Sequence, residues 1–169
     1  LREALIAASH KILNEQDADS LSLRAVAAEV GVSHMAPYSH FKSKKALFQE
    51  VAASGFDTLA QKMMSDSEGL THAPELILSY GVTYIEFALT QPQLYRLMLG
   101  QVENFGRRKA LQTDDHKTDT KQRSDISPEL QRRSKRPFDL LERAFAQTSH
   151  NEANAHAQAL GAWAMVHGM

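Results

Sequence analysis

Apolar side chains recur every three or four positions along most of this chain, which is the spacing of one face of an α-helix. Residues 1–14 set the pattern with Leu1, Leu5, Ala8 and Ile12. No stretch alternates apolar and polar residues for long enough to indicate a sheet. The pattern therefore predicts an all-α fold.

Two short helices are predicted next, separated by a tight turn. Ser22 can cap a helix that runs to Val30, and Gly31 suits its end because glycine readily adopts the left-handed conformation. Ser33 can cap a third helix that ends around residues 41–42. A helix, a turn containing glycine and a second short helix form the helix-turn-helix plan, in which the second helix fits the major groove of DNA.

The remainder of the chain predicts a helical bundle. Ser43 can cap a long helix of roughly 22 residues. Pro74 suits the first turn of the next helix, which a break at Gln91 and Pro92 ends. Further helices are predicted over residues 93–99, from residue 137 and from about residue 152.

These elements divide into two predicted domains. We expect a three-helix helix-turn-helix domain over residues 1–48 and an antiparallel helical bundle over residues 49–169. Both ends of the sequence fall inside helical patterns, so we expect the second domain to be truncated at its C-terminal end.

Composition removes several classes of protein from consideration. The 169 residues include no cysteine, which excludes disulfides, thiolate metal sites and a nucleophilic thiol. No apolar run approaches the roughly 18 to 20 residues that a membrane span needs, and no charged and then apolar leader opens the chain. We expect a soluble, cytoplasmic protein without a cofactor or metal.

Charge is unevenly distributed. The net charge of −1 argues against a nucleic-acid binder, but residues 33–45 contain three lysines and no acid. Residues 107–136 carry ten basic and five acidic side chains and few large apolar ones. This second stretch predicts a mobile, solvated loop.

The second helix of the predicted motif has polar side chains where a buried helix would be apolar. His34, Tyr38, Ser39 and His40 fall within seven residues. Such a helix is predicted to face a polar partner rather than a core.

At this point a family resemblance can be named. Residues 22–33 (Ser-Leu-Arg-Ala-Val-Ala-Ala-Glu-Val-Gly-Val-Ser) and 38–44 (Tyr-Ser-His-Phe-Lys-Ser-Lys) resemble the DNA-binding domain of the tetracycline-repressor (TetR) family, over residues 1–50. Residues 163–168 (Trp-Ala-Met-Val-His-Gly) and 94–98 (Leu-Tyr-Arg-Leu-Met) are similar to a Trp-His-Gly subclass of its C-terminal domains. The resemblance implies a transcriptional repressor that binds a palindromic DNA operator as a homodimer and is released by a small-molecule ligand.

The resemblance also implies roles for individual residues. Arg24 would reach a base or a phosphate, and residues 34–36 would touch base edges or a thymine methyl group. Tyr38 and His40 would hold phosphates, and Lys44 would add charge at the start of the following helix. The predicted DNA-binding set is Ser22, Arg24, Ser33, His34, Met35, Ala36, Tyr38, His40 and Lys44.

Two positions depart from the commonest family pattern. Pro37 removes at most one helical hydrogen bond, and Ser39 replaces a larger, often basic residue, which leaves the base sequence undetermined. Tyr38 and Phe41 have an alternative interpretation as core aromatics. The three lysines of residues 33–45 can instead belong to an ordinary solvated face.

Other predicted contacts have structural alternatives too. His40 can support the turn instead of meeting DNA, and His34 can be exposed without contacting it. Arg24 can pair with Glu29 or with another carboxylate.

Bulky apolar and phenolic side chains are concentrated behind the first domain. They predict a pocket for an apolar or aromatic small molecule, with a plain hydrophobic core as the alternative. The predicted ligand-binding set is Phe56, Leu59, Met63, Tyr80, Tyr84, Phe87, Tyr95, Met98, Phe138, Leu141 and Phe145.

Small residues near the C-terminus suggest a helix that packs closely on another helix. The resemblance implies that this is the homodimer contact, and the predicted set is Ala155, Ala159, Ala162, Trp163 and Val166. The alternative is a helix within its own chain, with Trp163 filling the interior.

The sequence leaves two other functions as alternatives. Eight histidines invite an enzymatic interpretation, but no His-x-x-x-His pair, nucleophile elbow or phosphate-binding glycine loop occurs, and no catalytic residue is predicted. An all-α partner-binding module without DNA binding is the other alternative.

Overall fold

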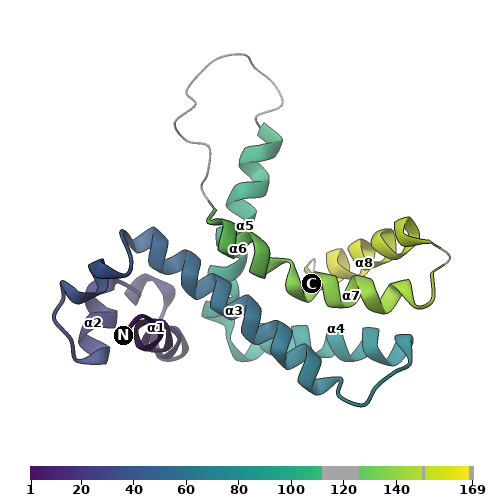
Figure 1. Cartoon of the computed structure of the whole chain (residues 1–169), viewed down its shortest axis with the longest axis horizontal. Coiled ribbons are helices and arrows are strands. Elements are labelled where there is room, and N and C mark those ends of the chain that lie inside the picture. The colour runs from purple at the N-terminus through teal and green to yellow at the C-terminus, as the bar shows by residue number, and fades with distance from the viewer. Residues whose placement is uncertain (112–125, 150, 168–169) are drawn as a thin grey trace. The chain divides into compact units, whose positions relative to one another are not determined.

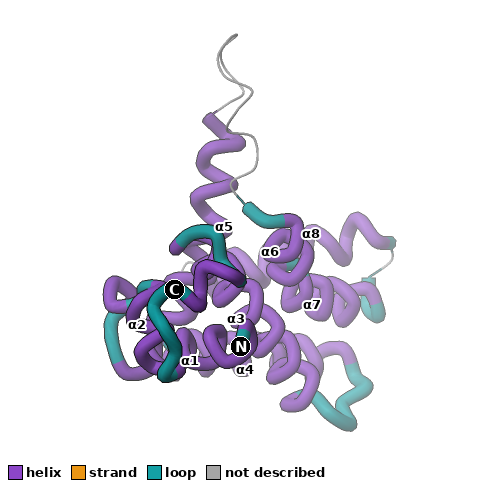
Figure 2. The backbone as a smooth tube through the Cα atoms, turned by 60° about the vertical axis from the view of Figure 1, so that its left-hand side comes forward, coloured by secondary structure: helices purple, strands orange, loops and turns teal. Residues whose placement is uncertain are grey.

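The computed structural model describes residues 1–111, 126–149 and 151–167. In these ranges it contains helices, turns and loops but no strand (Figure 1, Figure 2). The predicted all-α class is confirmed.

The chain forms two compact units. The first comprises Leu1–Gly55 with Gln91–Arg132, and the second comprises Phe56–Thr90 with Arg133–Met169. The predicted DNA-binding segment, residues 1–48, lies inside the first unit. The predicted C-terminal domain contributes to both.

The first unit is made of helical segments that pack on one another. Its elements are α1 (Arg2–Glu15), η1 (Ala18–Ser20), α2 (Leu23–Val30), η2 (Ala36–Ser39), the start of α3 (Lys44–Asp66) and α5 (Pro92–Leu111). The helix α2 packs against α1 and η2, and α1 also contacts α5. Their buried side chains include Leu5, Ile12, Leu13, Leu21, Val26, Phe41, Leu47 and Val51.

Both ends of α2 agree with the sequence prediction. The Ala25 N–H donates to the Ser22 hydroxyl oxygen at 3.1 Å, which satisfies one of the free donors of the first turn. Gly31 has φ +76°, the left-handed conformation that ends a helix.

The predicted third helix is wrong in type. The segment after the turn is a short 3₁₀ helix, Ala36–Ser39, and not an α-helix capped by Ser33. Pro37 has no N–H to donate to the carbonyl of Ser33, so the N–H groups of Ala36 and Tyr38 bond three residues back instead, at 2.9 and 3.1 Å.

The second unit contains the latter part of α3, α4 (Ala73–Thr90), α7 (Arg136–Ala146) and α8 (Glu152–His167). A short connection joins α7 and α8 into a hairpin (Figure 1), and α7 also packs on α4. The buried side chains of this unit include Leu59, Met63, Leu76, Tyr84, Phe87, Leu141, Ala144, Ala155 and Ala159.

The predicted solvated loop over residues 107–136 needs correction at both ends. The helix α5 continues to Leu111, and α6 occupies Pro128–Ser134. The N–H of Leu130 donates to the Ser127 hydroxyl oxygen at 3.1 Å, and the Leu130 side chain is fully buried. A Ser-Pro start and one buried leucine therefore make a helix that the basic composition concealed. Residues 112–125 lie outside the described residues.

Candidate functional site

The segment that follows α2 presents large side chains to solvent. Met35 is 64% exposed and Tyr38 is 52% exposed, whereas Pro37 between them is buried. Phe41, which follows the segment, is buried, and its N–H donates to the carbonyl of Pro37 at 2.8 Å. The core alternative holds for Phe41 and not for Tyr38.

Hydrogen bonds within this segment hold the backbone and leave the predicted contact side chains outward. The Ser33 hydroxyl oxygen accepts from the Met35 N–H at 3.3 Å, and the Ser39 hydroxyl donates to the Ala36 carbonyl at 2.7 Å. The side chains of His34 and His40 are exposed and hydrogen-bonded to none of the described residues. The alternative role of the His40 side chain in supporting the turn is therefore not seen.

Arg24 projects from the first turn of α2 and is exposed. Its alternative partner Glu29 is already paired with Lys11 at 2.6 Å, and this carboxylate raises the pKa of Lys11. Among the described residues Arg24 has no ion-pair partner. It remains available to an external anion.

The start of α3 concentrates positive charge. The Ser43 hydroxyl oxygen accepts from the Ala46 N–H at 3.1 Å and caps the helix as predicted. The Lys44 ammonium lies 5.0 Å from the centroid of the Phe48 ring, and Lys42 and Lys45 are also exposed. Free N–H groups and lysines at the N-terminus of a helix of 23 residues favour a bound phosphate.

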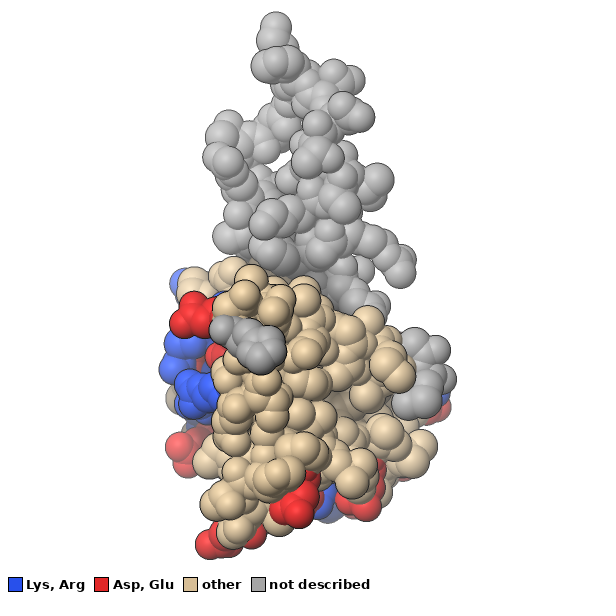
Figure 3. Space-filling model, turned by 90° about the vertical axis from the view of Figure 1, so that its right-hand side faces the viewer, with Lys and Arg blue, Asp and Glu red and all other residues tan. Residues whose placement is uncertain are grey.

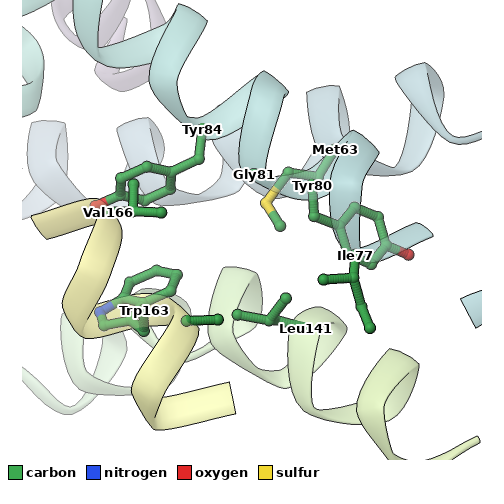
Figure 4. A pocket seen from close by; sticks show the side chains of 9 residues that line it. Met63, Ile77, Tyr80, Gly81, Tyr84, Leu141, Trp163 and Val166 are labelled. Carbon is green, nitrogen blue, oxygen red and sulfur yellow. The ribbon is translucent and has the colours of Figure 1, made fainter. Parts of the chain in front are cut away.

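A pocket opens inside the second unit (Figure 4). It encloses about 50 Å³ of space. Four helices contribute to its wall, with Met63 from α3 and Leu141 from α7 facing residues of α4 and α8. The lining residues are Met63, Ile77, Tyr80, Gly81, Tyr84, Leu141, Ala162, Trp163 and Val166.

One wall of the pocket is fixed by a chain of hydrogen bonds. The Nδ1 atom of His167 lies 2.9 Å from the carbonyl oxygen of Trp163, which can only accept, so the neutral ring carries its hydrogen there. The Nε2 atom then accepts from the Tyr84 hydroxyl at 2.8 Å. The Tyr84 and Trp163 rings meet edge to face, with centroids 5.0 Å apart.

Both parts of the chain are similar to known proteins. Residues 5–51 match the model of bacterial regulatory proteins of the tetR family, and residues 77–169 match the model of the tetracyclin repressor-like C-terminal domain. The second match alone spans more than half of the chain. The chain belongs to the TetR family.

Relatives support this membership. The nucleoid occlusion factor SlmA of Edwardsiella ictaluri is 32% identical over 108 residues, which are 62% of this chain and 53% of SlmA. The chain therefore spans about half the length of this curated relative.

Solved structures resemble the whole fold. A protein of unknown function from Rhodococcus sp. RHA1 matches with a TM-score of 0.75 and 28% identity, over 99% of this chain and 79% of that one. A possible TetR family transcriptional regulator from Streptomyces coelicolor A3(2) matches with a TM-score of 0.66 and 17% identity, over 99% of this chain and 68% of that one. The latter likeness shows the fold alone.

The N-terminal match is to a family of bacterial regulatory proteins. The residues predicted for DNA contact lie inside the matched segment 5–51. The C-terminal model covers the residues that carry the Trp-His-Gly resemblance without identifying that subclass, which stays a prediction.

The predicted ligand-binding residues do not all meet. Met63, Tyr80, Tyr84 and Leu141 line the pocket. The others lie elsewhere: Phe56, Leu59 and Phe87 are buried in the second unit, Tyr95 and Met98 belong to the first unit, and Phe138 and Phe145 lie on α7 outside the lining. The predicted set lacks Ile77 and Gly81, and it lacks Ala162, Trp163 and Val166, which were predicted as dimer residues instead. A glycine inside a helix gives no signal of a cavity.

The predicted dimer residues of this TetR chain lie on the inner side of α8. Ala155 and Ala159 are buried within the chain, and Ala162, Trp163 and Val166 line the pocket. The exposed residues of the helix are others: Glu152, Ala153, Asn154, His156, Ala157, Gln158, Leu160, Gly161, Ala164 and Met165. A dimer contact through this helix stays a prediction.

Ionisable groups outside the DNA-binding segment are mostly structural. His10 lies 3.2 Å from the Ser54 hydroxyl, and burial lowers its pKa. The Lys62 ammonium and the Thr83 hydroxyl hydrogen-bond to Asp66 and lower the pKa of that carboxyl group. Within the described residues no cluster of His, Asp and Glu could hold a metal ion, and no helix is long and apolar enough to cross a membrane.

Proposed function

We propose that this TetR regulator is a homodimeric repressor that binds a palindromic operator and is released when a small apolar molecule enters the pocket of its second unit. The observation that carries the proposal is the exposed pair Met35 and Tyr38, held outward by buried Pro37. Two large side chains exposed on a tight turn of a DNA-binding domain favour a partner surface that covers them.

The proposed reading surface extends from α2 to the 3₁₀ helix. Arg24 can donate two hydrogen bonds to a guanine edge, and His34 can donate to or accept from a base. Met35 offers an apolar contact for a thymine methyl group. These residues would set the base preference.

The residues proposed to contact the DNA phosphates lie beside the reading surface. Tyr38, His40 and Lys44 would contact phosphates, with the first turn of α3 adding its N–H groups. Phosphate contacts fix the orientation of a protein on DNA but carry no sequence information. They would supply most of the salt-dependent affinity.

A palindromic site requires two copies of the protein with their reading surfaces about 34–36 Å apart. The outer face of α8 suits a two-fold contact because Ala157, Gly161 and Ala164 allow another helix to approach closely, while Leu160 and Met165 offer apolar area. Figure 3 shows one face of the molecule, on which uncharged residues form a broad area with acidic and basic residues at its left and lower margins.

Release by a ligand requires that the ligand bind the DNA-free arrangement more tightly than the DNA-bound one. The pocket supports this role because α3 carries Lys44, a proposed phosphate contact, at its start and the pocket residue Met63 near its end. A ligand against Met63 would act on the same helix that begins at Lys44.

Selection of bound sequences from random DNA duplexes tests the proposal. Enrichment of a palindrome whose half-sites repeat about every 10 base pairs supports a dimeric reader. Enrichment of single half-sites would overturn the dimer. A failure to enrich any sequence at low salt would favour an all-α partner-binding module without DNA binding.

A further inference from the structure

Four large apolar side chains form a stripe along the outer face of α4. Their exposed fractions are 68% for Leu78, 47% for Val82, 38% for Ile85 and 75% for Leu89. The four positions follow one another at intervals of four, three and four residues. They therefore share one face of the helix over about three turns, opposite the residues that α4 buries in the core.

The stripe stays exposed in the folded chain. A helix at the surface of a globular protein normally turns its apolar face to the core and polar side chains to solvent. The helix α4 instead has apolar side chains on both faces. Four partly exposed side chains of this size present on the order of 400 Å² of apolar surface, and contiguous patches of this extent mark interaction sites.

Acidic side chains follow one edge of the stripe. Glu75 and Glu86 are exposed on α4, and neither forms an ion pair with any of the described residues. The Lys62 ammonium, whose pKa Glu86 helps to raise, is bonded to Asp66 at 2.8 Å. The edge therefore keeps negative charge that a cationic partner can neutralise.

A shallow groove lies along this acidic edge. Both glutamates line it, together with Leu78 and Val82 of the stripe and Leu70 from the connection between α3 and α4. It holds about 510 Å³ and is open to solvent. A groove with apolar and acidic walls suits the side of a polypeptide segment rather than an enclosed small molecule.

We propose that the stripe and its acidic edge bind an amphipathic helix of another protein, one that has apolar residues over about three turns and lysine or arginine beside them. Laid along α4, such a helix would cover Leu78, Val82 and Leu89 and direct its cations to Glu75 and Glu86. Removal of the leucine side chains from water supplies the affinity, and the charges select and orient the partner. This interaction is independent of DNA and of any ligand in the pocket.

A second copy of this chain fits the stripe less well. Two stripes paired antiparallel about a two-fold axis would bring the Glu86 carboxylates of both copies to the same edge, where they repel each other. The stripe also offers only about half of the roughly 800 Å² that each partner buries in a stable interface. A short helix of opposite charge avoids the repulsion and needs only a reversible contact.

A synthetic helical peptide of about 15 residues serves as the probe. It carries leucines at intervals of four, three and four positions, lysines beside them and alanine elsewhere. A matched peptide has glutamate in place of every lysine. Fluorescence anisotropy of each labelled peptide is measured against the full chain. The lysine peptide is expected to bind saturably and at least tenfold more tightly than the glutamate peptide, with a smaller difference at high salt.

Variants of the stripe test where the peptide binds. The double change Leu78→Ser and Leu89→Ser removes the two most exposed members, and it is expected to weaken binding of the lysine peptide at least tenfold. Both side chains face solvent, so the fold should persist, which circular dichroism checks. The control is Met64→Ser, at a methionine of α3 that is 56% exposed and lies outside the groove. It should bind the peptide as the unmodified chain does.

Variants of the acidic edge test the charge. Glu75→Gln combined with Glu86→Gln is expected to weaken binding of the lysine peptide at least fivefold at low salt and to flatten its salt dependence. Glu3→Gln combined with Glu152→Gln removes the same charge from exposed positions on α1 and α8. This control should leave both quantities unchanged.

Four results would overturn the proposal. They are no saturable binding of the lysine peptide, equal binding of the two peptides, unchanged binding in the folded stripe variant, and a dimer of the unmodified chain that the stripe variant loses. Sedimentation of both chains measures the last, which would assign the stripe to a second copy. A dimer that persists in the stripe variant while peptide binding is lost supports the proposal.

Discussion

The Tyr84 hydroxyl and the Nε2 atom of His167, 83 residues apart in the sequence, lie 2.8 Å from each other and join α4 to the last turn of α8. The other ring nitrogen of His167 bonds the Trp163 carbonyl within α8. One side chain of α4 thus holds both the end of α8 and the tryptophan that lines the pocket.

Tyr84→Phe is expected to lower the free energy of unfolding by about 1 kcal/mol, because it removes a hydrogen-bond donor and leaves the His167 nitrogen without it. Urea unfolding followed by circular dichroism measures the change. Tyr80→Phe is the matched control, since the Tyr80 hydroxyl points away from the pocket and bonds none of the described residues. Equal effects of the two variants would contradict the assigned role of the Tyr84–His167 bond.

Lys44→Ala and Tyr38→Ala are expected to weaken DNA binding on every sequence. Lys44→Ala should also reduce the slope of log affinity against log salt by about one, because one phosphate contact is lost. Fluorescence anisotropy on a selected operator and on a scrambled duplex measures both quantities.

The control for this pair is Lys62→Ala, which removes a lysine that is paired with Asp66 on the latter part of α3. It should leave the salt slope unchanged. His34→Ala is expected to change base preference rather than the salt slope. If Lys44→Ala altered only sequence preference, its assignment to a phosphate would be wrong.

Helix ends could be predicted from the sequence where a capping side chain or a glycine marks them. Ser22, Gly31 and Ser43 mark helix ends whose hydrogen bonds are local, so the predicted boundaries agree with the structure. Pro37 has a larger effect than the loss of one helical hydrogen bond. The missing N–H changes the hydrogen-bond pattern of a segment that is too short to absorb the loss, and an α-helix becomes a 3₁₀ helix.

The apolar character of the pocket could be predicted from the sequence, but the residues that line it could not. Helical spacing identifies the apolar face of a helix, but it does not show in which of the two compact units that face is buried. Met98 and Tyr84 looked equivalent in the sequence, but Met98 packs in the first unit and Tyr84 lines the pocket of the second. The small residues of α8 misled for a related reason, because small side chains permit close packing inside a chain as well as between chains.

Gly55→Ala is expected to destabilise the first unit. An added Cβ atom would lie 2.5 Å from Met98 Sδ and 3.1 Å from Leu94 Cδ1, and both side chains are buried. Overpacking of this kind costs about 1–3 kcal/mol, which outweighs the gain of up to about 1 kcal/mol from replacing a helical glycine. Gly100→Ala, with open space around its Cβ, should instead stabilise. Thermal unfolding of the two variants gives opposite shifts in Tm if α3 and α5 approach each other as described.

His10 is expected to make stability depend on pH. Burial lowers its pKa, so the folded chain binds the proton less readily than the unfolded chain. Neutral His10 therefore makes its full contribution to the free energy of unfolding above a pH of about 6.5, the ordinary histidine pKa. This contribution decreases as the pH falls from 6.5 toward the lowered pKa of His10 in the folded chain. The slope from one group cannot exceed about 1.4 kcal/mol per pH unit.

His10→Gln tests this assignment, because glutamine keeps a polar group near the Ser54 hydroxyl and does not titrate. Urea unfolding at pH 7.5 and 5.5 is compared for the two chains. The variant should lose less stability than the unmodified chain between these pH values. Identical losses would show that other groups carry the pH dependence.

Asp57 on α3 accepts from both Arg133 and Arg136, and its side chain is 20% exposed. Asp57→Asn keeps the shape and removes the charge that the two guanidinium groups share, so we expect a loss of about 1–2 kcal/mol in the free energy of unfolding. Higher salt should narrow the difference, because screening weakens the pairs only in the unmodified chain. Glu29→Gln, which breaks the more exposed pair with Lys11, serves as the control and should have no measurable effect. A loss that does not change with salt would mean that Asp57 acts through hydrogen bonds alone, and its charge would then add nothing to the link between α3 and α7.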